Sequence, residues 1–189
     1  MSVCILNRWT LGVTFALALA LAVTALADSG KMFLVADDCD PHDFDWVAVG
    51  GCFRDKGEVT RAEFRRANQN GYPGHPSWRI VPPYVAKQSD DEIRVRNTGG
   101  RVHTFTEVAR FGGGYIATLN PQGSIPAPEC ATVDPASGAL SPAPDALATT
   151  LAPGAEMRVE DLKPGTHNFQ CCVHPWMRST VKLTDDDRQ

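Results

Sequence analysis

A short run near the C-terminus places three metal-binding side chains on one loop, Cys171-x-x-His174-x-x-Met177. Strand-like segments flank this run at residues 166–171 and 180–183. A thiolate, an imidazole and a thioether are soft ligands that suit copper, which must be held in both of its oxidation states. A trigonal site of two imidazoles and one thiolate with a weaker thioether needs one more histidine. The fold must therefore bring a distant histidine to this loop.

His103 is the candidate for the missing ligand. Residues 93–96 alternate apolar and charged side chains, as a half-buried strand does, and residues 97–100 form a turn. The return strand, residues 102–108, carries His103 near its start. In a Greek-key sandwich, that strand end and the C-terminal loop can meet at the same pole.

Further strand-like segments indicate an all-β fold. Fourteen prolines and sixteen glycines among 189 residues indicate many turns. We expect an all-β Greek-key β-sandwich over residues 76–189, interrupted by a long irregular loop at residues 109–155 that is rich in Gly, Pro, Ala and Ser. A connection of that length without regular structure is unusual in a compact domain.

The first 27 residues have the pattern of a signal peptide. Arg8 is the only charge, an apolar run covers residues 9–27, and Ala25-Leu26-Ala27 has the small-x-small ending that signal peptidase accepts. The run is also just long enough for an uncleaved anchor, at ~20 residues. The polar residues 28–31 favour cleavage, so we expect a periplasmic or extracellular protein without stable membrane insertion.

Residues 28–75 are expected to form an N-terminal extension, because they are too few to bury a core of their own without a covalent link. Cys39 and Cys52 bracket a loop of twelve residues and are expected to form a disulfide. Residues 60–63, Thr-Arg-Ala-Glu, match a capping box, which predicts a short helix through about Ala67.

Residues 76–189 resemble the plastocyanin and amicyanin branch of the cupredoxin family, whose pattern is an upstream histidine ligand, then Cys-x-x-His and a methionine shortly after. The stretch His-Pro-Trp-Met-Arg that begins at His174 is most similar to amicyanin, where the loop reads Cys-x-x-His-Pro-x-Met-Arg. The resemblance implies a cupredoxin-like fold with one copper ion, Cu(I)/Cu(II), bound by His103, Cys171, His174 and Met177. Residues 28–75 and 109–155 lie outside the resemblance.

Two positions depart from the family pattern. The residue after the upstream histidine is commonly Asn, which helps to tie the two ligand loops together, whereas this chain has Thr104, whose hydroxyl is able to do similar work. Cys172 follows the expected ligand directly, and on an extended strand its side chain points away from that of Cys171. We therefore expect Cys172 to pair with Cys130.

The cysteine count agrees with this assignment. Of six cysteines, Cys4 lies in the signal peptide, and an odd number in an oxidising compartment leaves one thiol for another role, such as metal ligation. Cys172 as the ligand remains an alternative, although Cys172-x-His174 departs from the loop spacing. A dinuclear centre needs two cysteines several residues apart, which adjacent cysteines do not provide. His42, His75 and His167 are interpreted as surface or turn residues.

The resemblance implies one-electron transfer. A site without an open coordination position favours an electron carrier over an enzyme. Electrons would pass through the edge of His174, and redox partner proteins would dock on an apolar patch beside it at Pro175 and Trp176; a monomer is expected. The net charge of −4 and the lack of a basic patch argue against nucleic acid. The alternatives are a copper-storage or delivery protein and a metal-free binding module of the same fold.

Overall fold

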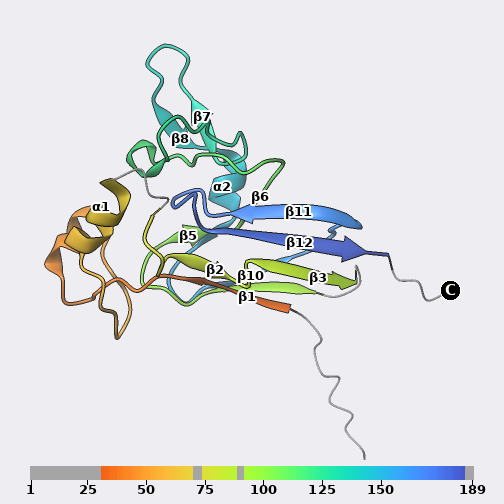
Figure 1. The fold of residues 1–189 in the computed structure, drawn as a ribbon, viewed down its shortest axis with the longest axis horizontal. Helices are drawn as coiled ribbons and strands as arrows, with labels where there is room; N and C mark the ends of the chain where they lie inside the picture. Colours follow the sequence, from red (N-terminus) through yellow and green to blue (C-terminus); the bar gives the residue numbers. More distant parts are fainter. Residues whose placement is uncertain (1–30, 70–73, 89–91, 186–189) are drawn as a thin grey trace, which may run out of the picture.

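Two four-stranded sheets pack against each other in the computed structural model, which describes residues 31–69, 74–88 and 92–185 (Figure 1). The first sheet has the order β10-β4-β1-β2 and contains β1 Lys31–Ala36, β2 Arg79–Val81, β4 Ile93–Asn97 and β10 Glu156–Val159. The second has the order β3-β12-β11-β6 and contains β3 Tyr84–Gln88, β6 Thr106–Val108, β11 Gly165–Gln170 and β12 Arg178–Thr184. The expected all-β sandwich is confirmed.

Strand β1 lies in a segment assigned above to the N-terminal extension. It pairs in parallel with β4, Lys31 opposite Ile93, and antiparallel with β2. Phe33 and Val35 alternate with half-exposed neighbours and are fully buried between the sheets. Because β1 lies between β4 and β2, residues 31–36 belong to the sandwich, and the boundary at residue 76 does not separate the extension from it.

Aromatic rings from both sheets fill the core beneath the C-terminal loop. The rings of Phe105 and Phe169 stack with centroids 4.4 Å apart, and the ring of Phe33 lies 5.6 Å from that of Phe105. Full burial of such a side chain contributes about 1.5–3 kcal/mol to stability. Phe169 is two residues before Cys171, so this packing fixes the strand end from which the loop departs.

The predicted return strand, residues 102–108, is divided in two. His103–Thr104 forms β5, which pairs with β9, Thr150–Leu151, whereas β6 joins the second sheet. Phe105 lies between them and is buried in the core. The alternation of apolar and polar residues does not reveal this division, because both halves keep the extended backbone of a strand.

The central segment 109–155 contains more regular structure than expected. It holds a short turn of helix η2, Ala117–Leu119, the hairpin of β7 Ala131–Val133 and β8 Leu140–Pro142, the helix α2 Pro144–Ala148, and β9. The hairpin projects from the sandwich at the top of Figure 1. The disulfide Cys130–Cys172, predicted from the sequence, joins this segment to the ligand loop.

The remainder of the N-terminal extension forms a lobe at one end of the sandwich (Figure 1). It contains the 3-10 helix η1, Phe44–Val49, and the helix α1, Arg61–Gln69. The predicted capping box is confirmed, because the Thr60 backbone N–H donates to Glu63 Oε2 at 2.9 Å and the Glu63 N–H donates to Thr60 Oγ1 at 3.3 Å. The predicted disulfide Cys39–Cys52 is present.

The predicted signal peptide, residues 1–27, and the new N-terminus at Asp28 lie outside the described residues. Within 31–69, 74–88 and 92–185, no helix combines the length and the apolar character that crossing a bilayer requires.

Candidate metal centre

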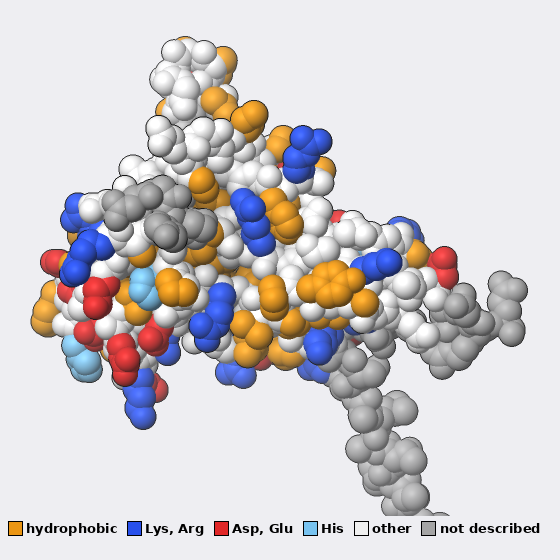
Figure 2. Space-filling view, viewed as in Figure 1, with side chains coloured by type: hydrophobic (Ala, Val, Ile, Leu, Met, Phe, Trp, Pro, Cys, Tyr) orange, Lys and Arg blue, Asp and Glu red, His pale blue; other side chains and the backbone are white. Residues whose placement is uncertain are grey.

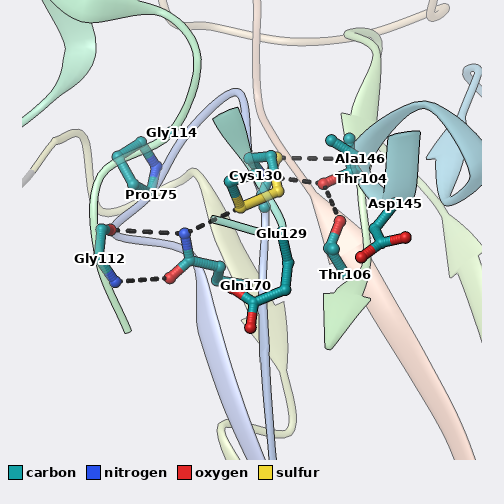
Figure 3. The surroundings of a disulfide bond; sticks show 12 residues. Thr104, Thr106, Gly112, Gly114, Glu129, Cys130, Asp145, Ala146, Gln170 and Pro175 are labelled. Carbon is teal, nitrogen blue, oxygen red and sulfur yellow. Dashed lines mark hydrogen bonds between the residues drawn. A yellow bond between two sulfur atoms is a disulfide. The ribbon is translucent and has the colours of Figure 1, made fainter. Parts of the chain in front are cut away.

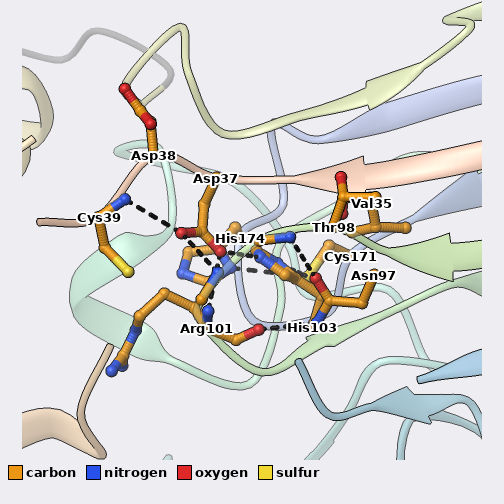
Figure 4. A network of polar contacts seen from close by, with 12 residues as sticks. Val35, Asp37, Asp38, Cys39, Asn97, Thr98, Arg101, His103, Cys171 and His174 are labelled. Atoms are coloured by element: carbon orange, nitrogen blue, oxygen red, sulfur yellow. Dashed lines mark hydrogen bonds and ion pairs between the residues drawn. The ribbon is translucent and has the colours of Figure 1, made fainter. Parts of the chain in front are cut away.

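Three buried side chains meet where the sequence predicts a metal site. The Sγ atom of Cys171 lies 3.7 Å from Nδ1 of His103 and 3.7 Å from Nδ1 of His174. The three possible ligand atoms lie within 4.8 Å of one another, and all three residues are buried (Figure 4). Cys171 is the free cysteine among the described residues.

These separations fit a bound metal ion. Bonds from a first-row metal are about 2.0 Å to an imidazole nitrogen and about 2.3 Å to a thiolate sulfur. Two such bonds at 120° place nitrogen and sulfur about 3.7 Å apart. The donor set of two imidazoles and one thiolate suits copper. The chain therefore fits the ion that its sequence predicts.

Hydrogen bonds within the ligand loop set its shape. The backbone N–H of Cys171 donates to the Met177 carbonyl at 3.0 Å, and the N–H of Met177 donates to the His174 carbonyl at 2.9 Å. Arg178 Nε donates to the Pro175 carbonyl at 2.8 Å. Met177 is buried in the main core cluster together with Cys171. The loop therefore closes on itself between β11 and β12, with the fourth predicted ligand at its end.

The two adjacent cysteines point to opposite sides, as predicted. Cys171 belongs to the main core between the sheets, whereas Cys172 belongs to a second buried cluster that contains Cys130 and Ala146. Because the sulfur of Cys172 is bonded to that of Cys130, it is not available as a thiolate. The structure thus excludes the alternative in which Cys172 is the ligand.

Thr104 ties the two ligand segments together. Its backbone N–H donates to Cys171 Sγ at 3.4 Å, and its hydroxyl oxygen accepts from the Cys172 N–H at 2.8 Å. Figure 3 shows the second bond beside the disulfide, with Thr106 Oγ1 donating to Thr104 Oγ1 at 2.9 Å. Thr104 thus joins the two segments, which is the role predicted for its hydroxyl from the sequence.

Gln170 joins the central segment to the strand that precedes the loop. Its Nε2 donates to Cys130 Sγ at 3.2 Å, and its Oε1 accepts from the Gly112 N–H at 3.1 Å (Figure 3). Gln170 is completely buried, so these bonds satisfy a side chain that water does not reach. The disulfide and this amide together hold residues near 112 and 130 against the site.

Asp37, which follows β1, is a site residue that sequence reasoning missed. Its Oδ2 lies 2.8 Å from His103 Nε2, and both side chains are fully inaccessible. A carboxylate only accepts hydrogen bonds, so the proton of this bond stays on Nε2. Nδ1 is therefore the His103 nitrogen that is able to lose its proton, and it is the one that faces Cys171.

The turn before β5 brings its backbone to Asp37. Oδ1 of Asp37 accepts from the Gly100 N–H at 3.1 Å, and Oδ2 accepts from the Arg101 N–H at 2.9 Å (Figure 4). A Cβ on Gly99 would lie 2.0 Å from Oδ2, so only glycine permits this approach. Asn97 shapes the turn, because its Oδ1 accepts from the Gly99 N–H at 2.9 Å. No motif in the sequence connects these residues to Asp37.

The contact between Asp37 and His103 shifts both pKa values. Burial alone would raise the pKa of Asp37, but the hydrogen bond and charge of His103, with the N–H groups of Arg101 and Cys39, lower it to about 2. Burial alone would lower the pKa of His103, but the hydrogen bonds to Asp37 and Cys171 and the charges of both raise it to about 9. The pair is an ion pair in the metal-free protein.

The pKa values of Cys171 and His174 also shift, in the directions that favour metal binding. Burial would raise the pKa of Cys171, yet the hydrogen bonds and charges of His103 and His174 hold it well below its usual value. Burial lowers the pKa of His174. A thiolate and a neutral imidazole are the forms that ligate a metal.

We expect the metal-free protein to lose stability on the acid side. The lowered pKa of Asp37 gives stability that is fully present above 3.8 and is lost as the pH falls toward 2. Between pH 6.5 and 9 the raised pKa of His103 and the lowered pKa of Cys171 act in opposite directions, because the folded pair holds its one proton on His103 and the unfolded pair holds it on Cys171. Urea unfolding should therefore show a fall on the order of 1–3 kcal/mol between about pH 4 and pH 2. A profile unchanged over that acid range would contradict the assigned contact of Asp37 with His103.

Aromatic side chains from the N-terminal extension and from the residue before β2 cover His174. The ring centroid of Phe64 lies 6.0 Å from that of His174, and that of Trp78 lies 6.4 Å away. His174 is only 3% exposed. Pro175 is buried and Trp176 is half-buried. The apolar patch expected around His174 is therefore not open to solvent, because the extension folds over it.

Comparisons with known proteins give matches only among solved structures, since no family model and no curated protein matches the chain. A purple cupredoxin from Nitrosopumilus maritimus is 12% identical, over 82% of this chain and 99% of that one, with a TM-score of 0.37. Amicyanin from Paracoccus versutus (Thiobacillus versutus) is 12% identical, over 56% and 73%, with a TM-score of 0.33. An oxidised amicyanin variant is 10% identical, over 85% and 88%, with a TM-score of 0.36.

The two packed sheets with few helices agree with the β-sandwich expected from the sequence. Because the TM-scores are below 0.5, what the site can do is inferred from its own distances and contacts.

Proposed function

We propose that this chain is an exported mononuclear type 1 copper protein that carries one electron at a time outside the cytoplasm. Its ligands would be His103, Cys171, His174 and Met177. One observation carries the proposal: a buried free thiol lies 3.7 Å from two imidazole nitrogens, while the other described cysteines are joined in disulfides.

The surroundings of the ligands suit electron transfer better than substrate chemistry. A bound copper ion would supply the one-electron Cu(II)/Cu(I) couple. The chain holds the thiolate and both imidazoles in place through Asp37, Thr104 and the closed loop, so the ligands need little movement. All three side chains are buried, and their donor atoms face one another rather than solvent. We therefore propose a carrier and not an enzyme.

Titration of the mature, reduced protein with Cu(II) tests the proposal. We expect one equivalent to bind and to produce an intense visible band from thiolate-to-copper charge transfer. Voltammetry should then show a reversible one-electron wave. Absence of the band would favour the metal-free binding module, and binding of two equivalents would contradict a mononuclear site.

The covered edge of His174 favours a second candidate, a copper-storage or delivery protein. A carrier in which His174 is only 3% exposed would exchange electrons with a partner over a longer distance. Two rates separate the candidates: electron self-exchange of the loaded protein and transfer of its copper to a Cu(I) chelator. Rapid self-exchange with slow metal transfer would support the carrier, and the reverse would support delivery.

A further inference from the structure

A groove of about 750 Å³ opens beside the candidate metal centre. One wall comes from α1 and η1, and the other comes from η2 with the ligand loop. His174 and Val173 line it together with Phe64 and Leu119. Its volume falls within the range of small-molecule sites, which is about 300–1,000 Å³. A molecule bound in the groove would therefore contact His174, although that residue is almost fully buried.

The groove carries a concentrated positive charge. Arg61, Arg65 and Arg101 line it, and no acidic residue does. The lobe that contains α1 shows acidic and basic side chains side by side on its outer face (Figure 2), and the whole chain has a net charge of −4. The arginines in the groove are therefore a local exception to the charge of the molecule.

The helix α1 directs one face into the groove. Arg61, Phe64, Arg65 and Asn68 line the groove at positions i, i+3, i+4 and i+7, which lie on the same side of a helix. Arg66 belongs to the same helix, is exposed like Arg65, and does not line the groove. Arg65 and Arg66 thus provide a matched pair of positions for substitution, one that lines the groove and one that does not.

The three arginines differ in how their guanidinium groups are held. Arg101 donates to the carbonyls of Val49 and Gly51 and lies 5.1 Å from the Trp46 ring centroid, yet its buried Nε has no hydrogen-bond partner among the described residues. Arg61 donates to the Asp45 carbonyl at 3.1 Å. Within the described part of the chain, the side chain of Arg65 makes no hydrogen bond or ion pair. Asp43 accepts from the Arg61 backbone N–H at 2.6 Å, and the charge of Asp37 acts on Arg101, but among the described residues no carboxylate forms an ion pair with any of the three guanidinium groups.

We propose that this groove binds a small organic anion, a carboxylate carried on an apolar or aromatic body. The carboxylate would pair with Arg65 at the mouth, where a bidentate bond to a guanidinium is available. The apolar body would contact Phe64, Leu119 and the edge of His174. An acidic segment of a partner protein carries the same charge, but a concave groove of this volume fits a small molecule better than a protein surface.

Calorimetric titration of the metal-free protein with 2-naphthoate and with its uncharged isostere 2-naphthamide tests the proposal. We expect naphthoate to bind and naphthamide to bind at least tenfold more weakly. Arg65→Gln should weaken naphthoate binding about tenfold, equivalent to about 1.4 kcal/mol, whereas Arg66→Gln should change it less than twofold. Because no copper is present, this result does not depend on the proposed function.

A second pair of variants tests the opposite wall. Thr118 lines the groove from η2, whereas its exposed neighbour Ala117 does not. Thr118→Glu should weaken naphthoate binding more than Ala117→Glu does, because it places a like charge inside the groove. Equal binding of naphthoate and naphthamide, or equal losses within either pair of variants, would overturn the proposal. Binding of a glutamate-rich peptide without binding of naphthoate would also overturn it, in favour of a partner protein.

Discussion

Replacing Cys171 by serine is expected to abolish the intense visible band of the Cu(II)-loaded protein, whereas Cys172→Ser should keep it. The band requires a thiolate bonded to the metal, and Cys171 Sγ is the sulfur that faces both imidazoles. Serine is a poor ligand for copper, so copper affinity should fall by a factor of about 100 or more. Absorption spectroscopy and competition with a chelator measure the two effects.

Cys172→Ser removes a different interaction. It breaks the disulfide to Cys130, which spans 42 residues, and should lower the free energy of unfolding by about 2–4 kcal/mol. The double variant Cys130→Ser/Cys172→Ser controls for the thiol that the single change releases. Loss of the band in the Cys172 variant together with its retention in the Cys171 variant would show that the wrong sulfur has been assigned.

Replacing Asp37 by asparagine is expected to weaken Cu(II) binding 10–100-fold and to raise the reduction potential. Residues that hydrogen-bond a metal-ligating histidine typically change affinity by roughly that factor. The carboxylate favours the more positive ion, so its removal destabilises Cu(II) more than Cu(I). Each tenfold loss of Cu(II) affinity relative to Cu(I) affinity raises the reduction potential by about 59 mV. Chelator competition and voltammetry measure these changes.

The same substitution should also destabilise the metal-free protein. An asparagine amide places an N–H₂ donor among donors from Cys39, Gly100, Arg101 and His103, and one such unsatisfied contact costs about 1–3 kcal/mol. The spectra are therefore to be compared at a temperature where circular dichroism shows the variant to be folded.

Asp38→Asn is the matched control for the neighbouring position. Asp38 is partly exposed and pairs with Arg54 at 3.4 Å, away from the ligands. Its replacement should leave copper affinity and potential unchanged. If folded Asp37→Asn binds copper with the affinity and potential of the unaltered protein, then Asp37 has only a structural role.

Local patterns were sufficient to predict the disulfides and to place three candidate ligands on one loop. The spacing of Cys171, His174 and Met177 lies within seven residues, and the opposite faces of Cys171 and Cys172 follow from the pleat of a strand. The helix start at Thr60 was also visible, because a capping box depends on residues three apart. Such features need no knowledge of the rest of the chain.

Long-range features were predicted less well. The position of β1 in the first sheet was missed, because the run that begins at Lys31 follows an apolar segment and its pairing with β4 is made across more than sixty residues. The division of residues 102–108 was missed for a similar reason, since it depends on β9 pairing with β5. Which strands pair depends on both members of the pair, and the alternation of apolar and polar residues in one strand does not identify the other.

The sequence by itself determined the donor atoms of the candidate site, because residue types and their spacing on one loop set which metal such a site suits. Only the tertiary structure decided what surrounds them. Asp37 reaches His103 across 66 residues, and the aromatic cover on His174 comes in part from the N-terminal extension. Contacts between segments so far apart leave no periodicity or motif in the chain, since they depend on how the strands and the extension pack after folding.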